Sequence, residues 1–348
     1  MKTSLAFLVL ALTDYRLALP GYTFVFPRDH FNHPEFRTEW WFYTGNLRSA
    51  QGKRFGYELT FFRQAQQPNA PAGANVWDVR DVWMAHLALS DIDGGHFYNT
   101  ERLNRSGPGL AGVDAQRGLI WNGNWQVNWR GDDQKLDAIA DNFKIDLSVR
   151  SAKPPVVHGT NGISQKAAGA GHASHYVSLT RLVTKGTITI EQQQYSVEGL
   201  SWMDHEFFSH SLESNQLGWD WFSLQFDDGS DLMLYRLRRK DGTVEPYSSG
   251  TYVDPAGKSR PLRLEEFKIE PGHAKYKEYP IEWTIDVPAL SLKCKIRTRL
   301  PQQELTGRTP YWEGAIEIEG AKGPSPIHGS GYLEMTGYIA PVNLGDRY

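Results

Sequence analysis

Short runs in which apolar and polar residues alternate recur along the chain, and sustained runs with helical periodicity are nearly absent. In residues 54–63, Phe55, Tyr57, Leu59 and Phe61 fall on one face of an extended segment. Because side chains of a strand point alternately to its two faces, this pattern predicts a strand with one buried face. The preceding run, residues 38–47, is rich in aromatic residues and ends in a Gly-Asn turn signal. The two runs together predict a β-hairpin.

Further strand-like runs follow, separated by turn residues. They occupy residues 82–90, 96–98, 121–129, 143–149, 175–182, 186–191, 250–253, 262–269, 281–287, 291–299, 312–318 and 331–338. Many short strands at regular spacing are typical of barrels and sandwiches, so we expect an all-β protein. Residues 151–174 are rich in Gly, Ala, Ser and Pro, which predicts a long loop that is either functional or disordered.

The second half of the chain repeats the pattern of the first. Residues 217–238 give an aromatic-rich strand, a turn with glycine, an alternating strand and then arginine, in the same order as residues 39–63. In this alignment Trp41 corresponds to Trp221, and Gly52 to Gly229. We interpret the repeat as an internal duplication. The 348 residues would then form two antiparallel β-barrels, over residues 21–206 and 207–348, with room for a ligand cavity.

The N-terminus has the pattern of a leader. Lys2 precedes an apolar run over residues 5–12, which is too short to span a membrane and fits the hydrophobic region of a secretory signal. We therefore expect residues 1–20 to be a signal peptide or leader and the protein to be periplasmic or secreted. An N-terminal strand or a different start is the alternative. No other run is apolar and long enough for a transmembrane helix.

Composition and missing motifs narrow the possible functions. Aromatic residues make up 13% of the chain, which favours β-structure with aromatic-lined cavities. The net charge of −3 and the lack of a basic run argue against nucleic acid as a partner. One cysteine, Cys294, excludes an intrachain disulfide and a multi-cysteine metal site, and its alternating run predicts a buried core residue. Phosphate-binding, serine-hydrolase and zinc-protease motifs are absent, which argues against a serine hydrolase. We expect neither cofactor nor metal.

The strongest concentration of chemistry lies in residues 199–207, GLSWMDHEF. If this segment is extended, Trp202, Asp204 and Glu206 share one face, and His205 points to the other. Two carboxyls this close, next to a tryptophan, repel each other, so one would keep its proton to higher pH and could act as a general acid. Residues 331–338 (GYLEMTGY) resemble this segment but keep only one acid, Glu334.

Structural alternatives exist for each of these residues. Either acid could pair with Arg63 or Arg236 at the domain junction, and His205 could be a hydrogen-bonded junction residue or an acid/base partner. Two other acids stand beside tryptophans: Glu39 precedes Trp41, and Asp220 precedes Trp221. Such acids would stabilise a cationic transition state. Alternatively, the tryptophans are core residues. The catalytic candidates are Asp204, His205 and Glu206. The substrate-binding candidates are Glu39, Trp41, Tyr43, Trp202, Trp219, Asp220, Trp221 and Tyr176.

Several long motifs together resemble the lipocalin-like AttH family, which also contains the carotenoid 1,2-hydratases. They are FPRDHFNHPEFRTEWWFYTGNL, FGYELTFFR, GLSWMDHEF, GWDWFSLQFDDGSDLMLYRLR and GYLEMTGY, and they cover nearly all of the chain after about Pro20. The resemblance implies a pair of lipocalin-like β-barrels, often exported. Its members include cofactor-free enzymes that protonate an isoprenoid double bond and add water. Others are cyclases of polyenes, predicted secreted hydrolases, or proteins associated with ABC export.

Two functions follow as hypotheses. The first is a cofactor-free hydro-lyase that acts on a hydrophobic, unsaturated, isoprenoid- or polyene-type substrate, with Asp204 or Glu206 as proton donor. The second is a non-catalytic periplasmic carrier of a lipid or lipophilic molecule, which could serve an ABC transporter. In both cases the expected ligand is small and hydrophobic.

Overall fold

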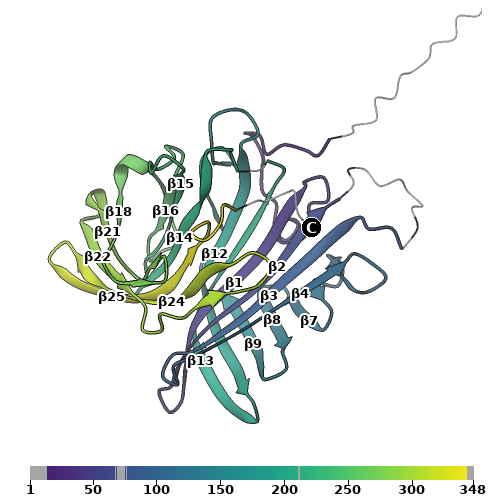
Figure 1. The fold of residues 1–348 in the computed structure, drawn as a ribbon, viewed down its shortest axis with the longest axis horizontal. Helices are drawn as coiled ribbons and strands as arrows, with labels where there is room; N and C mark the ends of the chain where they lie inside the picture. The colour runs from purple at the N-terminus through teal and green to yellow at the C-terminus, as the bar shows by residue number, and fades with distance from the viewer. Residues whose placement is uncertain (1–13, 67, 69–74, 76, 211, 343–348) are drawn as a thin grey trace, which may run out of the picture.

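The computed structural model describes residues 14–66, 68, 75, 77–210 and 212–342, which are almost entirely β-structure (Figure 1). Helical turns in these ranges are the 3₁₀ segments η1 (Arg28–His30), η2 (Leu264–Glu266) and η3 (Pro288–Leu290). The predicted all-β class is therefore confirmed. None of these described helical turns is long and apolar enough to cross a membrane. Residues 1–13, the larger part of the predicted leader, lie outside the described residues.

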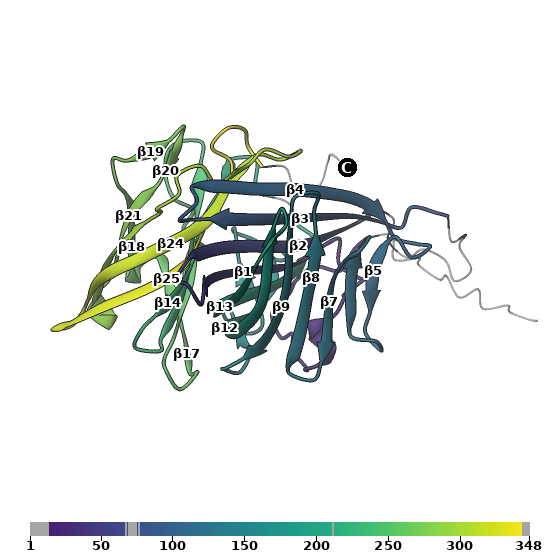
Figure 2. The same ribbon diagram turned by 90° about the horizontal axis from the view of Figure 1, so that it is seen from below.

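The first half of the chain forms a 13-stranded antiparallel sheet that curls into a nearly closed barrel (Figure 2). Its order is β4-β3-β2-β1-β13-β12-β9-β8-β7-β6-β5, and β10 and β11 pair with β12. The strands are β1 (Thr38–Ser49), β2 (Arg54–Ala65), β3 (Asp81–Asp91), β4 (His96–Arg105), β5 (Ala111–Asp114), β6 (Leu119–Asn122), β7 (Trp125–Arg130), β8 (Asp133–Ile139), β9 (Phe143–Ser151), β10 (Val156–Val157), β11 (Ser164–Gln165), β12 (Ala173–Ile190) and β13 (Gln193–Phe208).

Side chains, rather than a backbone ladder, connect the edge strand β4 to β6, which lies next to the other edge strand, β5. Asn104 on β4 donates from Nδ2 to Asn122 Oδ1 on β6 at 2.6 Å, and Arg102 Nη1 donates to the Asn122 carbonyl at 3.3 Å. Such contacts satisfy polar groups that an open edge would leave to solvent or to another chain.

The second half forms a 10-stranded sheet with the order β17-β16-β15-β14-β25-β24-β22-β21-β18, and β23 pairs with β24. It is a half-barrel, whereas the first sheet nearly closes: its far edge, β18, has only four residues and pairs on one side. The strands of this half are β14 (Gln216–Phe226), β15 (Asp231–Arg239), β16 (Ser249–Val253), β17 (Ser259–Arg263), β18 (Lys268–Pro271), β19 (Lys275–Tyr276), β20 (Tyr279–Pro280), β21 (Glu282–Val287), β22 (Leu292–Arg297), β23 (Glu304–Leu305), β24 (Tyr311–Lys322) and β25 (Ser325–Met335). Of these, β19 and β20 pair with each other in a separate two-stranded sheet.

The two sheets repeat one topology. In each, the first four strands form a meander, the first strand also pairs with the last, and the sheet then continues backwards along the chain. The two hairpin turns carry the same hydrogen bond: Gly52 N donates to the Ser49 carbonyl at 2.8 Å, and Gly229 N to the Phe226 carbonyl at 3.1 Å. The duplication inferred from the sequence is thus visible in the strand order.

The sequence alignment of the duplicated tryptophans is wrong. Counted back from the equivalent turns, Trp221 corresponds to Thr44, not to Trp41. Thr44 pairs with Trp202, and Trp221 pairs with Glu334, so Glu334 is the counterpart of Trp202. Aromatic runs dominate a visual alignment, but strand register is set by the turn, and an odd shift sends side chains to the opposite face.

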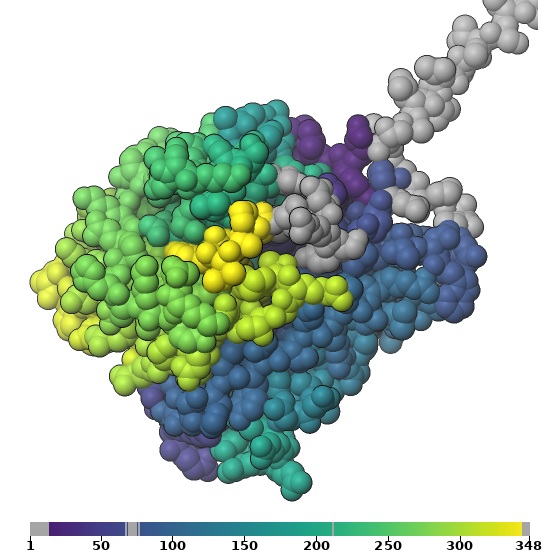
Figure 3. All heavy atoms as spheres, in the orientation of Figure 1, coloured from purple at the N-terminus to yellow at the C-terminus, as the bar shows by residue number. Residues whose placement is uncertain are grey.

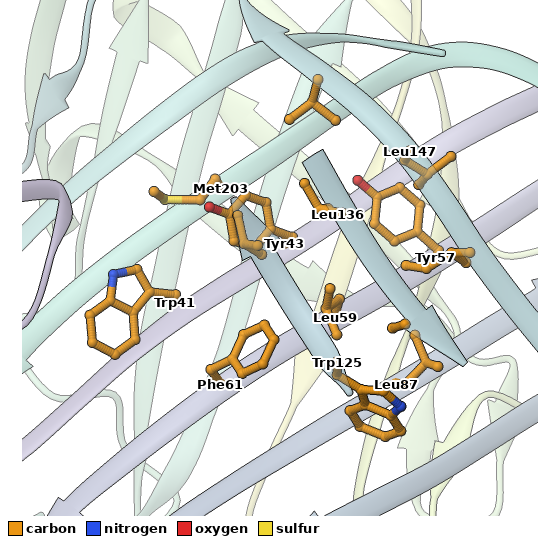
Figure 4. Packing of buried hydrophobic residues seen from close by; sticks show 14 of the residues in the cluster. Trp41, Tyr43, Tyr57, Leu59, Phe61, Leu87, Trp125, Leu136, Leu147 and Met203 are labelled. Atoms are coloured by element: carbon orange, nitrogen blue, oxygen red, sulfur yellow. The ribbon is translucent and has the colours of Figure 1, made fainter. Parts of the chain in front are cut away.

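Three apolar clusters hold the structure together. One fills the first barrel and includes Trp41, Tyr43 and Leu59 (Figure 4). A second lines the half-barrel and includes buried Cys294, as predicted for that residue. The third lies between the sheets, where the outer face of one packs against the outer face of the other, and includes Phe42. Figure 3 shows the C-terminal strands lying directly against the first barrel.

Candidate functional site

The outward face of β13 lines a cavity between the two sheets, not the interior of a barrel. As the alternation predicted, Asp204 and Glu206 share this face, whereas His205 points into the first barrel. The cavity has a volume of about 110 Å³. Its lining combines aromatic rings with acids and a lysine: Trp40, Phe42, Phe62, Lys166, Tyr176, Asp204, Glu206, Phe208, His210, Leu212, Trp219, Trp221, Tyr235 and Glu334.

Larger hollows occur elsewhere but lack this combination. One of about 680 Å³ is lined by Arg54, Arg299 and Glu317, which pair with one another. Another of about 1090 Å³ has no aromatic side chain in its lining. The interdomain cavity is therefore the candidate site, because ligand sites combine apolar walls with a few convergent polar groups.

Asp204 is the central polar group of this pocket. It is buried and accepts hydrogen bonds from Trp202 Nε1 at 2.6 Å and from the hydroxyls of Tyr176 and Ser178. Burial raises the pKa of Asp204 to about 7, although the three donors oppose that rise. Near neutral pH the carboxyl can therefore both give and take a proton, as a general acid or base must.

A histidine behind Ser178 fixes the direction of these hydrogen bonds. His158 lies with Nε2 2.6 Å from Ser178 Oγ and Nδ1 2.8 Å from Thr251 Oγ1, on the second sheet. Burial lowers the pKa of His158 to about 3, so the ring is neutral and has one donor and one acceptor nitrogen. With the proton on Nε2, His158 donates to Ser178, which leaves the serine hydroxyl to donate to Asp204.

Glu206 is paired rather than free. Its carboxylate lies 3.1 Å from Lys166 Nζ and accepts a hydrogen bond from Ser174. Lys166 Nζ also lies 4.0 Å from the ring centroid of Tyr235 and 5.1 Å from that of Tyr176. Burial alone would lower the pKa of Lys166, but Glu206 holds it above its ordinary value. The predicted 151–174 loop supplies this lysine, so the loop is part of the site.

The second sheet forms the opposite wall. Trp219 Nε1 donates to Glu334 at 2.8 Å, and Trp221 Nε1 donates to the Tyr176 hydroxyl at 3.0 Å. Burial raises the pKa of Glu334 to about 8, and the nearby acids add to the rise. The pocket thus has a carboxyl of raised pKa on each wall, with aromatic rings between them.

His205 belongs to a separate buried network around Glu39. His205 Nε2 lies 2.9 Å and His33 Nδ1 2.8 Å from Glu39 Oε1, and Arg63 Nε donates to Glu39 Oε2 at 3.1 Å. The ligand atoms of His33, Glu39 and His205 lie within 4.8 Å of one another, close enough to share a metal ion. However, the Arg63 charge beside Glu39 opposes a cation there. The network clamps the 28–36 segment onto the barrel.

The candidate residues therefore divide by strand face. Asp204, Glu206, Tyr176, Trp219 and Trp221 line the pocket, and Trp202 supports Asp204. The remaining candidates do not reach it: His205 and Glu39 form the network above, and Trp41 and Tyr43 fill the barrel core, as Figure 4 shows for the latter two. Asp220 pairs with Arg236 at 2.6 Å and accepts from Tyr338 at 2.9 Å.

Sequence reasoning missed pocket residues for two reasons. Trp40 and Phe42 line the pocket in place of Trp41 and Tyr43, because the pocket lies on the outward face of β1 and not inside the barrel. Lys166 and Glu334 come from a loop and from the other sheet, and only the tertiary fold brings them to Asp204. The resemblance of GYLEMTGY to GLSWMDHEF, with Glu334 as its single acid, was the one available signal for Glu334.

Adjacent tryptophans provide a test of this assignment. We expect Trp41→Ala, which empties a fully buried core position, to lower the free energy of unfolding by about 3–5 kcal/mol. Trp40→Ala, on the pocket side, should cost less stability but weaken binding of an apolar fluorescent probe. Urea unfolding and probe titration measure the two effects. Equal loss of stability in both variants would contradict the assignment of the faces.

Comparison with solved structures supports the fold. An AttH structure from Nitrosomonas europaea is 29% identical, with a TM-score of 0.81 over 93% of this chain and 99% of that one. Kievitone hydratase from Nectria haematococca is 14% identical, with a TM-score of 0.70 over 94% of this chain and 98% of that one. At that identity the second likeness concerns the fold alone.

Sequence comparison gives the family. The dehydratase asqC of Emericella nidulans is 20% identical over 209 residues, which span 56% of this chain and only 58% of that protein. The AttH-like family matches residues 17–338, nearly the whole of the described structure and both of its sheets. The resemblance read from the motifs is thus confirmed, and the chain belongs to the AttH-like family.

Proposed function

We propose that this protein is a hydro-lyase that adds water to, or removes it from, the branched end of an isoprenoid-type substrate in the interdomain pocket. The observation that carries the proposal is Asp204, a buried carboxyl of raised pKa set among aromatic rings. A hydratase among the structural neighbours and a dehydratase among the sequence relatives support the same class of reaction.

The pocket residues suggest the steps. Protonated Asp204 would give its proton to the less substituted carbon of a trisubstituted alkene, the one that carries a hydrogen, and the electron pair of the double bond would form the new C–H bond. The tertiary cation would lie against the rings of Trp219 and Trp221, whose faces attract positive charge. Water would then bond to the cation and lose its proton to Glu206 or to the newly formed Asp204 carboxylate. Dehydration is the reverse.

The size of the pocket limits what it can hold. Its volume of about 110 Å³ is below the roughly 300–1,000 Å³ of sites that enclose a whole drug-sized ligand. We therefore propose that only the reacting end of the substrate enters, and that the rest of a longer molecule lies outside. This favours catalysis at a chain end over carriage of an entire lipid.

A substrate screen tests the proposal directly. Purified protein would be incubated with prenylated phenols, isoprenoid alkenes and the matching tertiary alcohols, and products analysed by mass spectrometry for gain or loss of one water. In D₂O we expect deuterium on carbon in the hydrated product. If no compound reacts and the purified protein instead releases an unchanged lipid, the carrier function is favoured.

The pH dependence follows from the carboxyl. The pKa of Asp204 is raised by burial to about 7, so its acid form predominates below that pH and is lost above it. Hydration should therefore be fastest below about pH 7 and fall about tenfold per pH unit above it. Initial rates from pH 5 to 9 measure this fall in the hydration rate, with a dye-based unfolding control at each pH. A rate that rises with pH through this range would assign the step to a base.

A further inference from the structure

The contact between the sheets contains a second group of carboxyls, to which the proposed hydration gives no role and of which only one lines the pocket. They are Glu58 on β2, Glu313 on β24 and Glu334 on β25, here called the seam acids. Glu58 is 0% and Glu313 1% exposed. Glu313 and Glu334 are directly opposite each other in the β24–β25 register. In the described part of the chain, neither lysine nor arginine forms a salt bridge with any of the three.

Carboxylates buried without a counter-charge are costly, so such groups bind protons instead. Thr60 donates to Glu58 Oε1 at 2.5 Å, but Glu58 Oε2 and both oxygens of Glu313 lack a hydrogen-bond partner among the described residues. Burial raises the pKa of both groups; Glu58 and Glu334 raise that of Glu313 further, whereas His86 and Thr60 oppose the rise at Glu58. The seam acids also do not form a described cluster close enough to hold a metal ion.

A line of polar groups leads from the seam acids to the surface. Tyr311 lies two residues before Glu313 on β24, and its hydroxyl is 2.7 Å from His86 Nδ1 on β3. On the other side of the ring, His86 Nε2 is 3.6 Å from Glu101 Oε2, whose side chain is 22% exposed. His86 and Glu101 line a surface hollow of about 240 Å³. Because Tyr311 and Glu313 are two residues apart on β24, their side chains share one face of the strand. Burial and then the seam acids raise the pKa of Tyr311.

The other end of the line is the pocket. Glu334 lines the pocket together with Asp204 and Glu206, and both of these raise the pKa of Glu334 after burial. The titratable groups that face the seam acids from the strands packed around them are Tyr311 on β24, Tyr332 on β25, His86 on β3, and Asp204 and Glu206 on β13.

We propose that the seam acids hold protons at neutral pH and, through Tyr311 and His86, connect the pocket with the surface at Glu101. A neutral carboxyl both donates and accepts, so a proton can enter at one end while another leaves at the opposite end, with no net charge buried. When a hydrophobic substrate displaces water from the pocket, this route keeps the pocket acids in exchange with solvent. The role of this route during turnover rests on the proposed function, but the protonation of the seam acids does not.

The first test is infrared spectroscopy of the substrate-free protein at pH 7. Protonated carboxyls give a carbonyl band separate from those of carboxylates and the backbone. We expect Glu58→Gln and Glu313→Gln each to remove part of this band. Glu319→Gln, on the same strand as Glu313 with a side chain 66% exposed, is the matched control and should leave it unchanged. A band that is intact in both seam variants would overturn the proposal.

The second test asks whether the line is open at both ends. After rapid mixing into D₂O, the shift of the Glu313 band reports its exchange with solvent. His86→Gln closes the surface end and Glu334→Gln the pocket end. Each alone should slow exchange little, because the other end remains open. The double variant should be slower than either by at least about tenfold, or about 1.4 kcal/mol of added barrier.

Other outcomes overturn the connection. Exchange in the double variant as fast as in the wild type would mean that breathing of the fold, not the line, carries the protons. One single variant as slow as the double would mean that only one end is connected. Tyr311→Phe interrupts the line one step inward from His86. It should change the exchange rate as His86→Gln does, which separates loss of the connection from a folding defect at His86. None of these measurements involves turnover, so their failure is distinct from failure of the hydro-lyase function.

Discussion

Asp204→Asn is expected to lower the hydration rate by about 10²–10⁴-fold while leaving the protein folded, because it removes the proton donor but keeps the shape of the side chain. An amide oxygen can still accept from Trp202 Nε1 and Ser178. The amide nitrogen, in contrast, faces the Tyr176 hydroxyl, which donates to Asp204 in the wild type, so a modest loss of stability of about 1–2 kcal/mol is expected as well. Rates under saturating substrate and urea unfolding separate the two effects.

A matched variant keeps the carboxyl and changes only its acidity. Ser178→Ala removes one of the donors that hold the pKa of Asp204 down against burial. The pKa should rise, and the alkaline limb of the rate profile should move to higher pH with activity retained at low pH. Full activity in Asp204→Asn would show that another group donates the proton. Glu334→Gln, on the opposite wall, would then be the next variant to assay.

Arg63→Met is expected to lower the free energy of unfolding by about 3–5 kcal/mol, because it removes a charged partner of the buried Glu39 carboxylate, which then keeps only His33 as a charged partner among the described residues. Arg63 Nε donates to Glu39 at 3.1 Å, Nη1 to Asp81 at 2.9 Å, and Nη2 to the carbonyls of His33 at 2.9 Å and Phe36 at 2.7 Å. One side chain thus ties β1 and β2 to the segment that covers the end of the barrel. Urea unfolding at pH 7 measures the loss.

Two further variants show whether the loss of stability in Arg63→Met comes from the buried network. Arg150→Met removes an ion pair with Asp133 whose side chains are 65% and 53% exposed, and should leave stability unchanged. Adding Glu39→Gln to Arg63→Met removes the stranded charge, so the double variant should be less destabilised than the sum of the singles by about 0.5–3 kcal/mol. Strict additivity would contradict a coupled network.

The same network limits the pH range of stability. Despite burial, its hydrogen bonds hold the pKa of Asp29 and Glu39 well below their ordinary values, so their contribution is present near neutral pH and lost as pH falls. The same partners, against burial, raise the pKa of His33 to about 9. Its contribution is complete below about pH 6.5 and is lost as pH rises through 9.

Local sequence pattern determined the fold class and the sides of the strands. The alternation in residues 54–63 places Phe55 and Tyr57 in the barrel core, as the structure confirms. The same period of two separates Asp204 and Glu206 from His205. These are properties of a single extended segment, because successive side chains of a strand must point to opposite faces. The repeated strand order could also be predicted, because both halves of the sequence share the same pattern of strands and turns.

Tertiary structure alone decided which faces meet. Alternation says that a strand has two sides, but not whether a polar side faces water, a barrel lumen or another sheet. Here the outer faces of two sheets close on each other, so Asp204 lies in a seam and not inside a barrel. Lys166 and Glu334 join it from a loop and from the other sheet. The raised pKa of Asp204 has the same origin, because desolvation depends on what covers a group in space and not on its neighbours in the chain.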